Sequence, residues 1–435
     1  VVSYLDCDAS TRIRPFDSVG STGFSRPFQL PGAYMKHLIS VVCLLLIAPS
    51  AFAREVPEEW PEWLRDAMMR EGNTKATKEF SIADDTISGE VKGKFVEKPS
   101  LNDNFWYFTT DIKAESEFMC WIFPEGVDSA ASTTAIVDNL INMNSEALGG
   151  VGMKSLYYHD VYSYEGSPIL ALEWVYNTAS EENKQIGLAK IRTALIGESN
   201  LICGHTSVGY RETFAEAFDH LVANIAMQRD RDPYYETLHS ISINDTPVGF
   251  ARVSMFEDAD GDTEIRTTDA TMMPVDESNL STTDGSTLEF SFSNGQLINQ
   301  YVTSVENGNV VLNAQLGYNE ESWVVTGTAQ GKAIEVTIDS DVSVASTLGQ
   351  LLEIREMMQS GEDQTVDFSM WIPDVDPTVF STVEVALTES DRGTLALGPL
   401  VFDAELDSHG NLERGVADIG GIAMEMAKVW EQGAP

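Results

Sequence analysis

The stretch TLEFSFSNGQLINQYVTSVENGNVVLNAQL, residues 287–316, decides the fold of the second half of the chain. Asn294-Gly295 and Asn307-Gly308 divide it into three runs of strand-forming residues. Asn-Gly pairs accept the positive φ angles of tight hairpins, so the runs predict neighbouring antiparallel strands. Leu288, Phe290 and Phe292 alternate with polar residues, which predicts an apolar strand face that must be covered.

The same pattern extends on both sides of this stretch. Strands are predicted at 235–243, 248–256, 263–273, 287–292, 296–305, 309–316, 322–329 and 333–338, and again at 365–372, 382–387, 394–406 and 422–430. Asn, Asp or Gly occupies the intervening turns up to residue 331, as in a meander of adjacent antiparallel strands. Residues 343–359 place Val344, Leu348 and Leu351 at helical spacing, which predicts a covering helix.

Residues 234–435 therefore predict a strand-rich, curved antiparallel sheet or open barrel with one covering helix. This outline resembles the periplasmic lipoprotein carriers and related lipid-binding half-barrels. Because an open half-barrel leaves an interior to be filled, we expect a mostly apolar groove for a lipid or other hydrophobic small molecule.

The first half of the chain mixes helices and strands. Helices are predicted at 56–71, 129–148 and 211–227, and strands at 80–82, 90–96, 106–112, 117–123, 155–164, 169–176, 185–196 and 201–207. This order predicts a two-layer antiparallel sheet and helix domain over residues 54–230, and Arg229 to Pro233 then breaks the pattern. The predicted fold class of the whole chain is α+β with two domains.

The stretch LICGHTSVGYRETFAEAFDHLVANI, residues 201–225, carries a further resemblance. Together with the hairpin before it, it resembles the PsbP-like fold, in which helices back an antiparallel sheet and the last strand runs directly into a closing helix. Members of that fold do many unrelated things, so the resemblance implies no activity.

MKHLISVVCLLLIAPSAFA, residues 35–53, is typical of a cleavable signal peptide. A short basic start precedes a compact apolar run, and Ala51-Phe52-Ala53 supplies the small residues that signal peptidase needs. We expect residues 1–34 to be an extension upstream of the true start, and the mature chain to be periplasmic or secreted, with no transmembrane segment after cleavage. An uncleaved membrane anchor, or a lipoprotein attached through Cys43, is the alternative.

The net charge and the cysteines indicate which partners and which compartment to expect. The formal net charge of −41 would repel phosphate backbones, so nucleic acid is not expected as a partner. The carboxylates are spread along the chain, which favours a solvated acidic surface. Cys120 and Cys203 are the cysteines beyond the signal peptide, and in an oxidising compartment such a pair predicts a disulfide.

Two residue groups are candidates for chemistry. Ser207, His205, His159 and Asp160 could converge as a hydrolase triad, although GHTSVG lacks the G-x-S-x-G elbow. Alternate carboxylates, as in calcium loops, occur at Asp258, Asp260, Asp262 and Glu264, but Thr263 replaces the glycine of an EF-hand. We interpret this run as an acidic turn, and Asp374 and Asp376 as a loop. A thiolate at Cys203 beside His205 would require an unbridged cysteine.

The motifs of zincins, dithiol redox proteins, P-loop enzymes and Rossmann proteins do not occur in the sequence. No cofactor and no metal are expected. We therefore favour a non-catalytic binding protein for a hydrophobic ligand. The alternatives are an exported serine hydrolase of the esterase type and an envelope module that binds another protein.

Overall fold

The computed structural model describes residues 61–435, apart from gaps at 73–75, 84, 99–105, 114–115, 124–128, 183, 228–230, 259–260, 277, 320, 339–341, 361–363 and 398–399. The predicted signal peptide and the extension before it lie outside the described residues. Among the described residues, no helix has both the length and the apolar character needed to cross a membrane.

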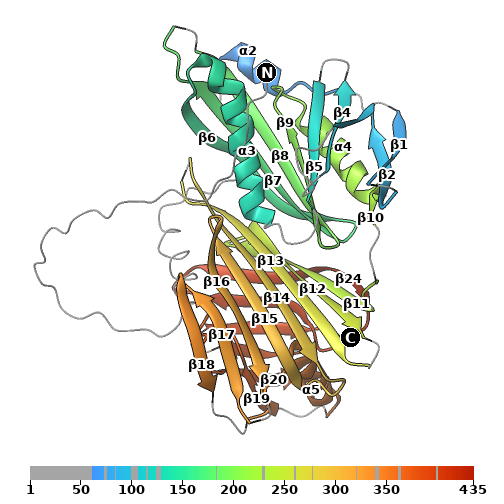
Figure 1. The fold of residues 1–435 in the computed structure, drawn as a ribbon, viewed down its shortest axis with the longest axis vertical. Helices are drawn as coiled ribbons and strands as arrows, with labels where there is room; N and C mark the ends of the chain where they lie inside the picture. Colours follow the sequence, from blue (N-terminus) through green and yellow to red (C-terminus); the bar gives the residue numbers. More distant parts are fainter. Residues whose placement is uncertain are drawn as a thin grey trace, which may run out of the picture. The chain divides into compact units, whose positions relative to one another are not determined.

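Residues up to 227 form two antiparallel sheets (Figure 1). The seven-stranded sheet has the order β3 (Phe95–Lys98), β4 (Trp106–Lys113), β5 (Ser116–Phe123), β9 (Ser199–His205), β8 (Ile186–Ile196), β7 (Ser167–Thr178) and β6 (Val151–Tyr164). A three-stranded sheet has the order β1 (Thr77–Ile82), β2 (Ile87–Lys92) and β10 (Ala226–Met227).

Helices cover both faces of the seven-stranded sheet. The described residues up to 227 include the helices α2 (Glu62–Met68), α3 (Ser129–Ser145), which continues as a 3-10 turn (Glu146–Leu148), and α4 (Arg211–Asn224). Phe214 and Phe218 of α4 pack in one apolar cluster with Ile169 and Cys203. Leu140 of α3 packs in a second apolar cluster. The strand residues of this cluster alternate with those of the first and therefore point to the other face of the sheet. The central strands are therefore apolar on both sides, as in a fully covered sheet.

Residues from 235 onward form one antiparallel sheet of fourteen strands. Its first part, from one edge inward, contains β18 (Lys332–Ile338), β17 (Trp323–Ala329), β16 (Asn309–Tyr318), β15 (Leu297–Glu306), β14 (Leu280–Ser291), β13 (Thr263–Pro274), β12 (Thr246–Glu257) and β11 (Tyr235–Ile243). It continues through β24 (Ala423–Gly433), β23 (Leu412–Asp418), β22 (Leu400–Leu406), β21 (Arg392–Leu397) and β20 (Ser381–Glu389) to the other edge, β19 (Gln364–Met370).

Helix α5 (Thr347–Ser360) lies against the inner face of this sheet. Its Leu348 and Leu351 pack against Tyr235, Met255 and Ile265 near the middle of the sheet. Its Ile354 and Met357 pack with side chains of β19, β20 and β22. One helix therefore contacts strands that are far apart in the strand order, so the sheet must curve around it. The curve is not a closed barrel, because β18 and β19 remain as edges.

The α+β class and the curved, helix-covered sheet predicted from the sequence are confirmed. The predicted strand 394–406 is wrong, since the structure has two paired strands there, β21 and β22. Strand β23 was not predicted, and the helix expected at 211–227 ends at Asn224 because Ala226 and Met227 pair with β2. The helix expected at 56–71 is described only over Glu62–Met68.

The division into two domains stays a prediction. The strands of the seven-stranded and fourteen-stranded sheets do fall on opposite sides of residues 231–234. However, one apolar cluster includes Leu140 and Trp174 together with Leu238, Phe250 and Met272, so the two sheets share a core.

Candidate functional site

Helix α5 fills only part of the inner face of the fourteen-stranded sheet. Glu289 of β14 fixes the start of the helix, because its carboxylate accepts hydrogen bonds from the Thr347 backbone N–H at 2.9 Å and the Thr347 hydroxyl at 3.2 Å. Such a carboxylate satisfies otherwise unpaired N–H groups of a helix N-terminus. Ile265 of β13 contacts the helix, and the inner face beyond Ile265 has a different character.

Beyond α5, β13 and β14 present small and hydroxyl-bearing side chains inward, and β15 adds Ser304 next to the buried Val302. Cross-strand pairing sets Asp269 beside Gly285, which lies beside Ser304, and sets Thr267 beside Thr287 and Thr271 beside Thr283. All of them are half-buried. The Thr271 and Thr283 hydroxyl oxygens are 2.6 Å apart and hydrogen-bonded. We call this set of seven residues the hydroxyl strip.

Asp269 lies at the centre of the hydroxyl strip. It is half-buried, so part of its surface stays accessible to solvent. No described residue donates a hydrogen bond to it or forms an ion pair with it. Burial, followed by repulsion from Asp374 and Asp284, raises the pKa of Asp269 from 3.8 to about 7.

Gly285 makes room for that carboxyl. A side-chain carbon at position 285 would collide with the carboxylate of Asp269, so the aspartate lies across the face of the glycine. Asp374 approaches from the loop after β19 and accepts a 2.6 Å hydrogen bond from the Ser304 hydroxyl. Trp371, which is buried, anchors the same loop by donating its indole N–H to the Pro377 carbonyl at 3.1 Å.

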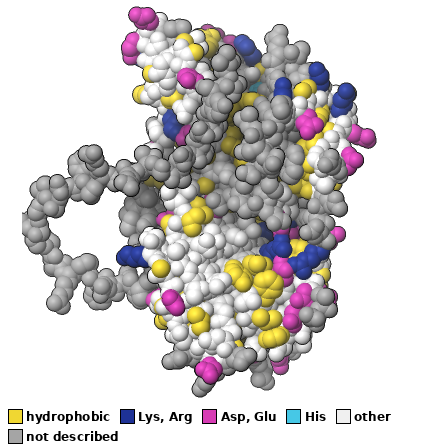
Figure 2. Space-filling model, in the orientation of Figure 1, with side chains coloured by type: hydrophobic (Ala, Val, Ile, Leu, Met, Phe, Trp, Pro, Cys, Tyr) yellow, Lys and Arg dark blue, Asp and Glu magenta, His cyan; other side chains and the backbone are white. Residues whose placement is uncertain are grey.

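Strand β14 reverses the orientation that its sequence predicts. Thr283, Gly285, Thr287 and Glu289 face inward, so Leu288 and Phe290 lie on the outer face, where Leu288 pairs with Tyr301. Tyr301 and Phe292 are each 44% exposed. Leu288 and Phe290 are half-buried, and the apolar row of this strand lies on the side of the sheet that α5 does not cover. Figure 2 shows hydrophobic side chains gathered on the viewer's face of the fourteen-stranded sheet.

The opposite wall of the inner face holds a fully paired charge network. Lys428 of β24 forms ion pairs with Asp407 at 2.6 Å, Glu413 at 2.7 Å and Glu431 at 3.1 Å. These carboxylates raise the pKa of Lys428 and outweigh the effect of its burial. The Tyr235 hydroxyl also donates to Glu431, at 3.0 Å. Since every carboxylate of this group has a partner, we interpret the network as structural.

The four residues of the predicted triad do not converge. His159 pairs with Leu172 and faces the side of the seven-stranded sheet that α3 covers. Asp160 and His205 face the α4 side but lie on β6 and β9, with β7 and β8 between them. The His205 ring stacks on Phe214 with ring centroids 5.6 Å apart, and burial lowers its pKa well below the usual value.

The surroundings of Ser207 indicate a structural role for this region. The Ser207 carbonyl accepts a hydrogen bond from the ammonium of Lys190, which also donates to the Gly209 carbonyl at 2.7 Å. Burial lowers the pKa of Lys190 to about 8. Next to it, Arg211 holds Glu173 through two hydrogen bonds of 2.8 Å. These charges hold the loop between β9 and α4 in place.

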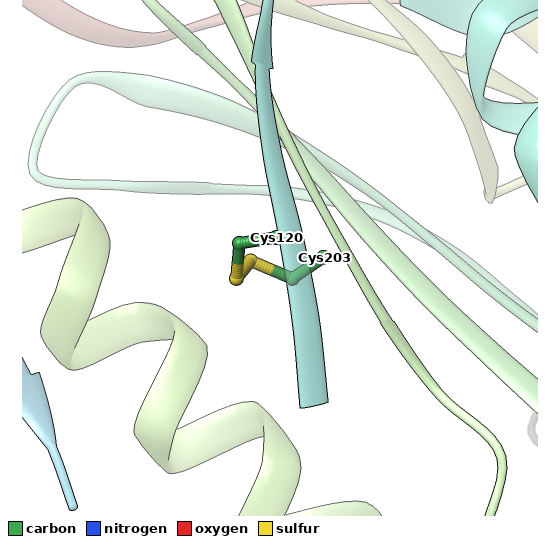
Figure 3. The surroundings of a disulfide bond; sticks show 2 residues. All are labelled: Cys120 and Cys203. Carbon is green, nitrogen blue, oxygen red and sulfur yellow. A yellow bond between two sulfur atoms is a disulfide. The ribbon is translucent and has the colours of Figure 1, made fainter. Parts of the chain in front are cut away.

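Cys120 and Cys203 are directly opposite each other on β5 and β9 (Figure 3). Their sulfur atoms are 2.03 Å apart in a disulfide, and both residues are buried under α4. The bridge joins strands that are 83 residues apart in the sequence. In this arrangement Cys203 presents no thiolate to His205.

The acidic run at 258–264 is described at both ends, and its last residue, Glu264, belongs to strand β13. The Asp258 carboxylate accepts from the Asp262 backbone N–H at 3.0 Å, and Asp260 lies outside the described residues. Glu264 instead pairs with Arg231 and Arg266. Asp376 accepts hydrogen bonds from Thr378 within its own loop. Within the described part of the chain, no group of three or more His, Cys, Asp or Glu side chains is placed to hold a metal ion.

Sequence reasoning missed Asp269. The one signal for it is an aspartate inside a strand run, IRTTDATMM at 265–273, since aspartate is depleted in strands.

No family model and no curated protein matches the chain. Some solved structures are similar to parts of it. A β-barrel-like protein of a domain of unknown function, DUF1849, from Brucella abortus matches at 12% identity and a TM-score of 0.38, covering 46% of this chain and 98% of that one. The cyanobacterial PsbP of Synechocystis sp. PCC 6803 matches at 12% identity and 0.24, covering 36% and 95%.

A third structure, of a protein from Bacteroides thetaiotaomicron VPI-5482, matches at 10% identity and a TM-score of 0.22, covering 37% of this chain and 52% of that one. At these scores the likenesses carry no argument about function. The resemblances to the PsbP-like fold and to the lipoprotein carriers stay predictions.

Proposed function

We propose that the chain is a non-catalytic binding protein, and that a small molecule with a hydrophobic body binds against the inner face of the fourteen-stranded sheet. The observation that carries this proposal is the incomplete filling of that face. Helix α5, together with Val344 and Trp371 on either side of it, buries part of that face, while apolar side chains near both edges of the sheet lie beside these clusters and remain half-buried. They are Ile334, Val336 and Ile338 on β18, Met370 on β19, and Leu395 and Leu397 on β21.

Half-buried apolar side chains on a concave face favour a ligand, because removing their surface from water stabilises a complex by about 25 cal/mol per Å². In the seven-stranded sheet, the described side chains of the central strands are covered on both sides.

The test compares two neighbouring residues of β18. Val336 faces inward and Thr337 faces outward, and Thr337 is exposed. We expect Val336→Glu to weaken the binding of 1-octanol about tenfold or more, because a carboxylate would have to be desolvated in the complex. Thr337→Glu should bind like the wild type. Isothermal titration calorimetry measures both, and circular dichroism checks that each variant is folded. Absence of octanol binding to the wild type would contradict the proposal.

We also propose that the chain is exported. The signal-like sequence at 35–53 supports this, as does the buried cysteine pair, which suits an oxidising compartment. N-terminal sequencing of the protein from its native host should find the chain beginning near Arg54. Recovery with residues 35–53 still attached would contradict cleavage.

A further inference from the structure

We propose that the ligand of the inner face carries a primary ammonium group, and that Asp269 binds this group. This inference rests on the proposed function and assigns the polar end of the same site. Its basis is the juxtaposition of an unpaired carboxylate, a glycine that gives the carboxylate space, and hydroxyl groups on both sides of it.

Asp269 lacks a counter-charge among the described residues. A carboxylate inside a protein is normally paired or hydrogen-bonded, because desolvation without a partner costs free energy. Asp269 has no such partner among the described residues, and no described basic group lowers its pKa. The neighbouring acids, Asp284 and Asp374, already have partners. Asp284 accepts from the Ala130 and Ala131 backbone N–H groups, and Asp374 accepts from Ser304.

The charges around Asp269 determine the sign of the ligand group that can bind there. Asp374 and Asp284 both repel a negative charge at Asp269, so the same field attracts a cation. The net charge of −41 acts in the same direction and over a longer range. A cationic group is therefore favoured over a neutral or anionic one.

The side chains around Asp269 favour a primary ammonium over other cations. A metal ion would need several ligands, and the described residues offer no group of three that could hold one. A primary ammonium has three N–H donors. Asp269 can accept one of them, and the half-buried hydroxyls of Thr267, Thr271, Thr283 and Thr287 line the inner face on either side of the carboxyl. A quaternary ammonium has no N–H and would leave these acceptors unused.

The experiment compares ligands that share one chain length. Octylamine, octyltrimethylammonium and 1-octanol are titrated into the protein at pH 8, where alkylammonium is protonated and Asp269 is ionised. Because hydrogen bonds to charged groups are strong, we expect octylammonium to bind about tenfold or more tightly than octanol. Octyltrimethylammonium should bind more weakly than octylammonium.

Three variants test whether Asp269 causes the preference for octylammonium. Asp269→Asn keeps the shape of the side chain but removes its charge, and should abolish the preference for octylammonium while octanol binds as before. Asp367→Asn is the matched control, because Asp367 is exposed on the outer face of β19. Gly285→Ala should weaken octylammonium binding without a change in charge, because the new methyl group displaces the Asp269 carboxylate.

The outcomes separate the two proposals. Equal binding of octylammonium and octanol by the wild type would overturn the inference and leave the binding function intact, as would a preference that survives in Asp269→Asn. Binding of none of the three probes would overturn the binding function itself. Retention of the preference in Asp367→Asn and its loss in Asp269→Asn would support the assignment.

Discussion

The two large sheets of this protein differ in how completely their faces are covered. The seven-stranded sheet is covered by α3 on one face and α4 on the other, and its charged residues Glu173 and Lys190 are paired with Arg211 of α4 and with backbone carbonyls, respectively. The inner face of the fourteen-stranded sheet is partly covered by α5, and an unpaired carboxyl lies beyond that helix among the described residues. The first arrangement is that of a structural core, and the second is the basis of the proposed binding function.

The largest effect is expected from removing a core side chain of the seven-stranded sheet. Phe218 of α4 is fully buried against this sheet. Replacing it with Ala should lower the free energy of unfolding by about 3–5 kcal/mol, because the cavity loses both packing and transfer energy. Urea unfolding followed by fluorescence measures the change. A loss below about 1 kcal/mol would mean that this core is loosely packed, and the contrast between the sheets would fail.

The disulfide should have the next largest effect. Replacing both Cys120 and Cys203 with Ser removes a cross-link that spans 83 residues, which should cost about 2–5 kcal/mol. The same urea experiment, run with and without dithiothreitol, measures it. The reductant should shift the wild-type midpoint and leave the double variant unchanged. If the reductant has no effect on the wild type, either the bridge is absent or the reagent cannot reach it, and thiol titration of the unfolded chain separates the two cases.

Asp269 should make stability depend on pH in an unusual direction. Its pKa is raised from 3.8 to about 7, so the folded state retains a proton that the unfolded state releases between these values. The stability that this group contributes is complete below about pH 4 and is lost as the pH rises through about 7. Asp269→Asn should therefore unfold a few degrees higher than the wild type at pH 8, with the difference shrinking toward pH 5.

Thermal unfolding at several pH values measures that difference, with Asp367→Asn as the control. Asp367 is exposed on the outer face, so its variant should follow the wild-type pH profile. An Asp269→Asn variant that is less stable than the wild type at pH 8 would show that the carboxylate has a partner that stabilises the fold.

The smallest effect is expected on the hydroxyl strip. Thr287 is half-buried, and no hydrogen bond from its side chain is described. Thr287→Ala should change the free energy of unfolding by about 0.5 kcal/mol or less, as at positions away from packed features. A loss as large as that at Phe218 would show that the inner face is a packed core after all.

Local sequence signals predicted the strands well because turn chemistry is local. Asn307 and Gly308 both have positive φ angles, 47° and 75°, as expected of the hairpin between β15 and β16. The predicted strand at 235–243 has the bounds of β11. Periodicity also placed Leu348 and Leu351 on the buried side of a helix.

Other features depend on contacts between distant residues. The pairing of β11 with β24, which joins the two parts of the large sheet, links residues nearly 200 positions apart and leaves no local trace. Alternation in β14 showed that one face is apolar but could not show that this face points outward. The environment of Asp269 arises from three strands and the loop of Asp374, so its role could not be predicted from its neighbours in the sequence.

The most direct test of the central claim, that the inner face beyond α5 accepts a ligand, is a crystal structure of the chain grown with octylamine. The alkyl chain should lie against the half-buried apolar side chains of the fourteen-stranded sheet, and the amine within hydrogen-bonding distance of Asp269. An inner face closed by its own side chains, with octylamine absent or bound on the seven-stranded sheet, would contradict it.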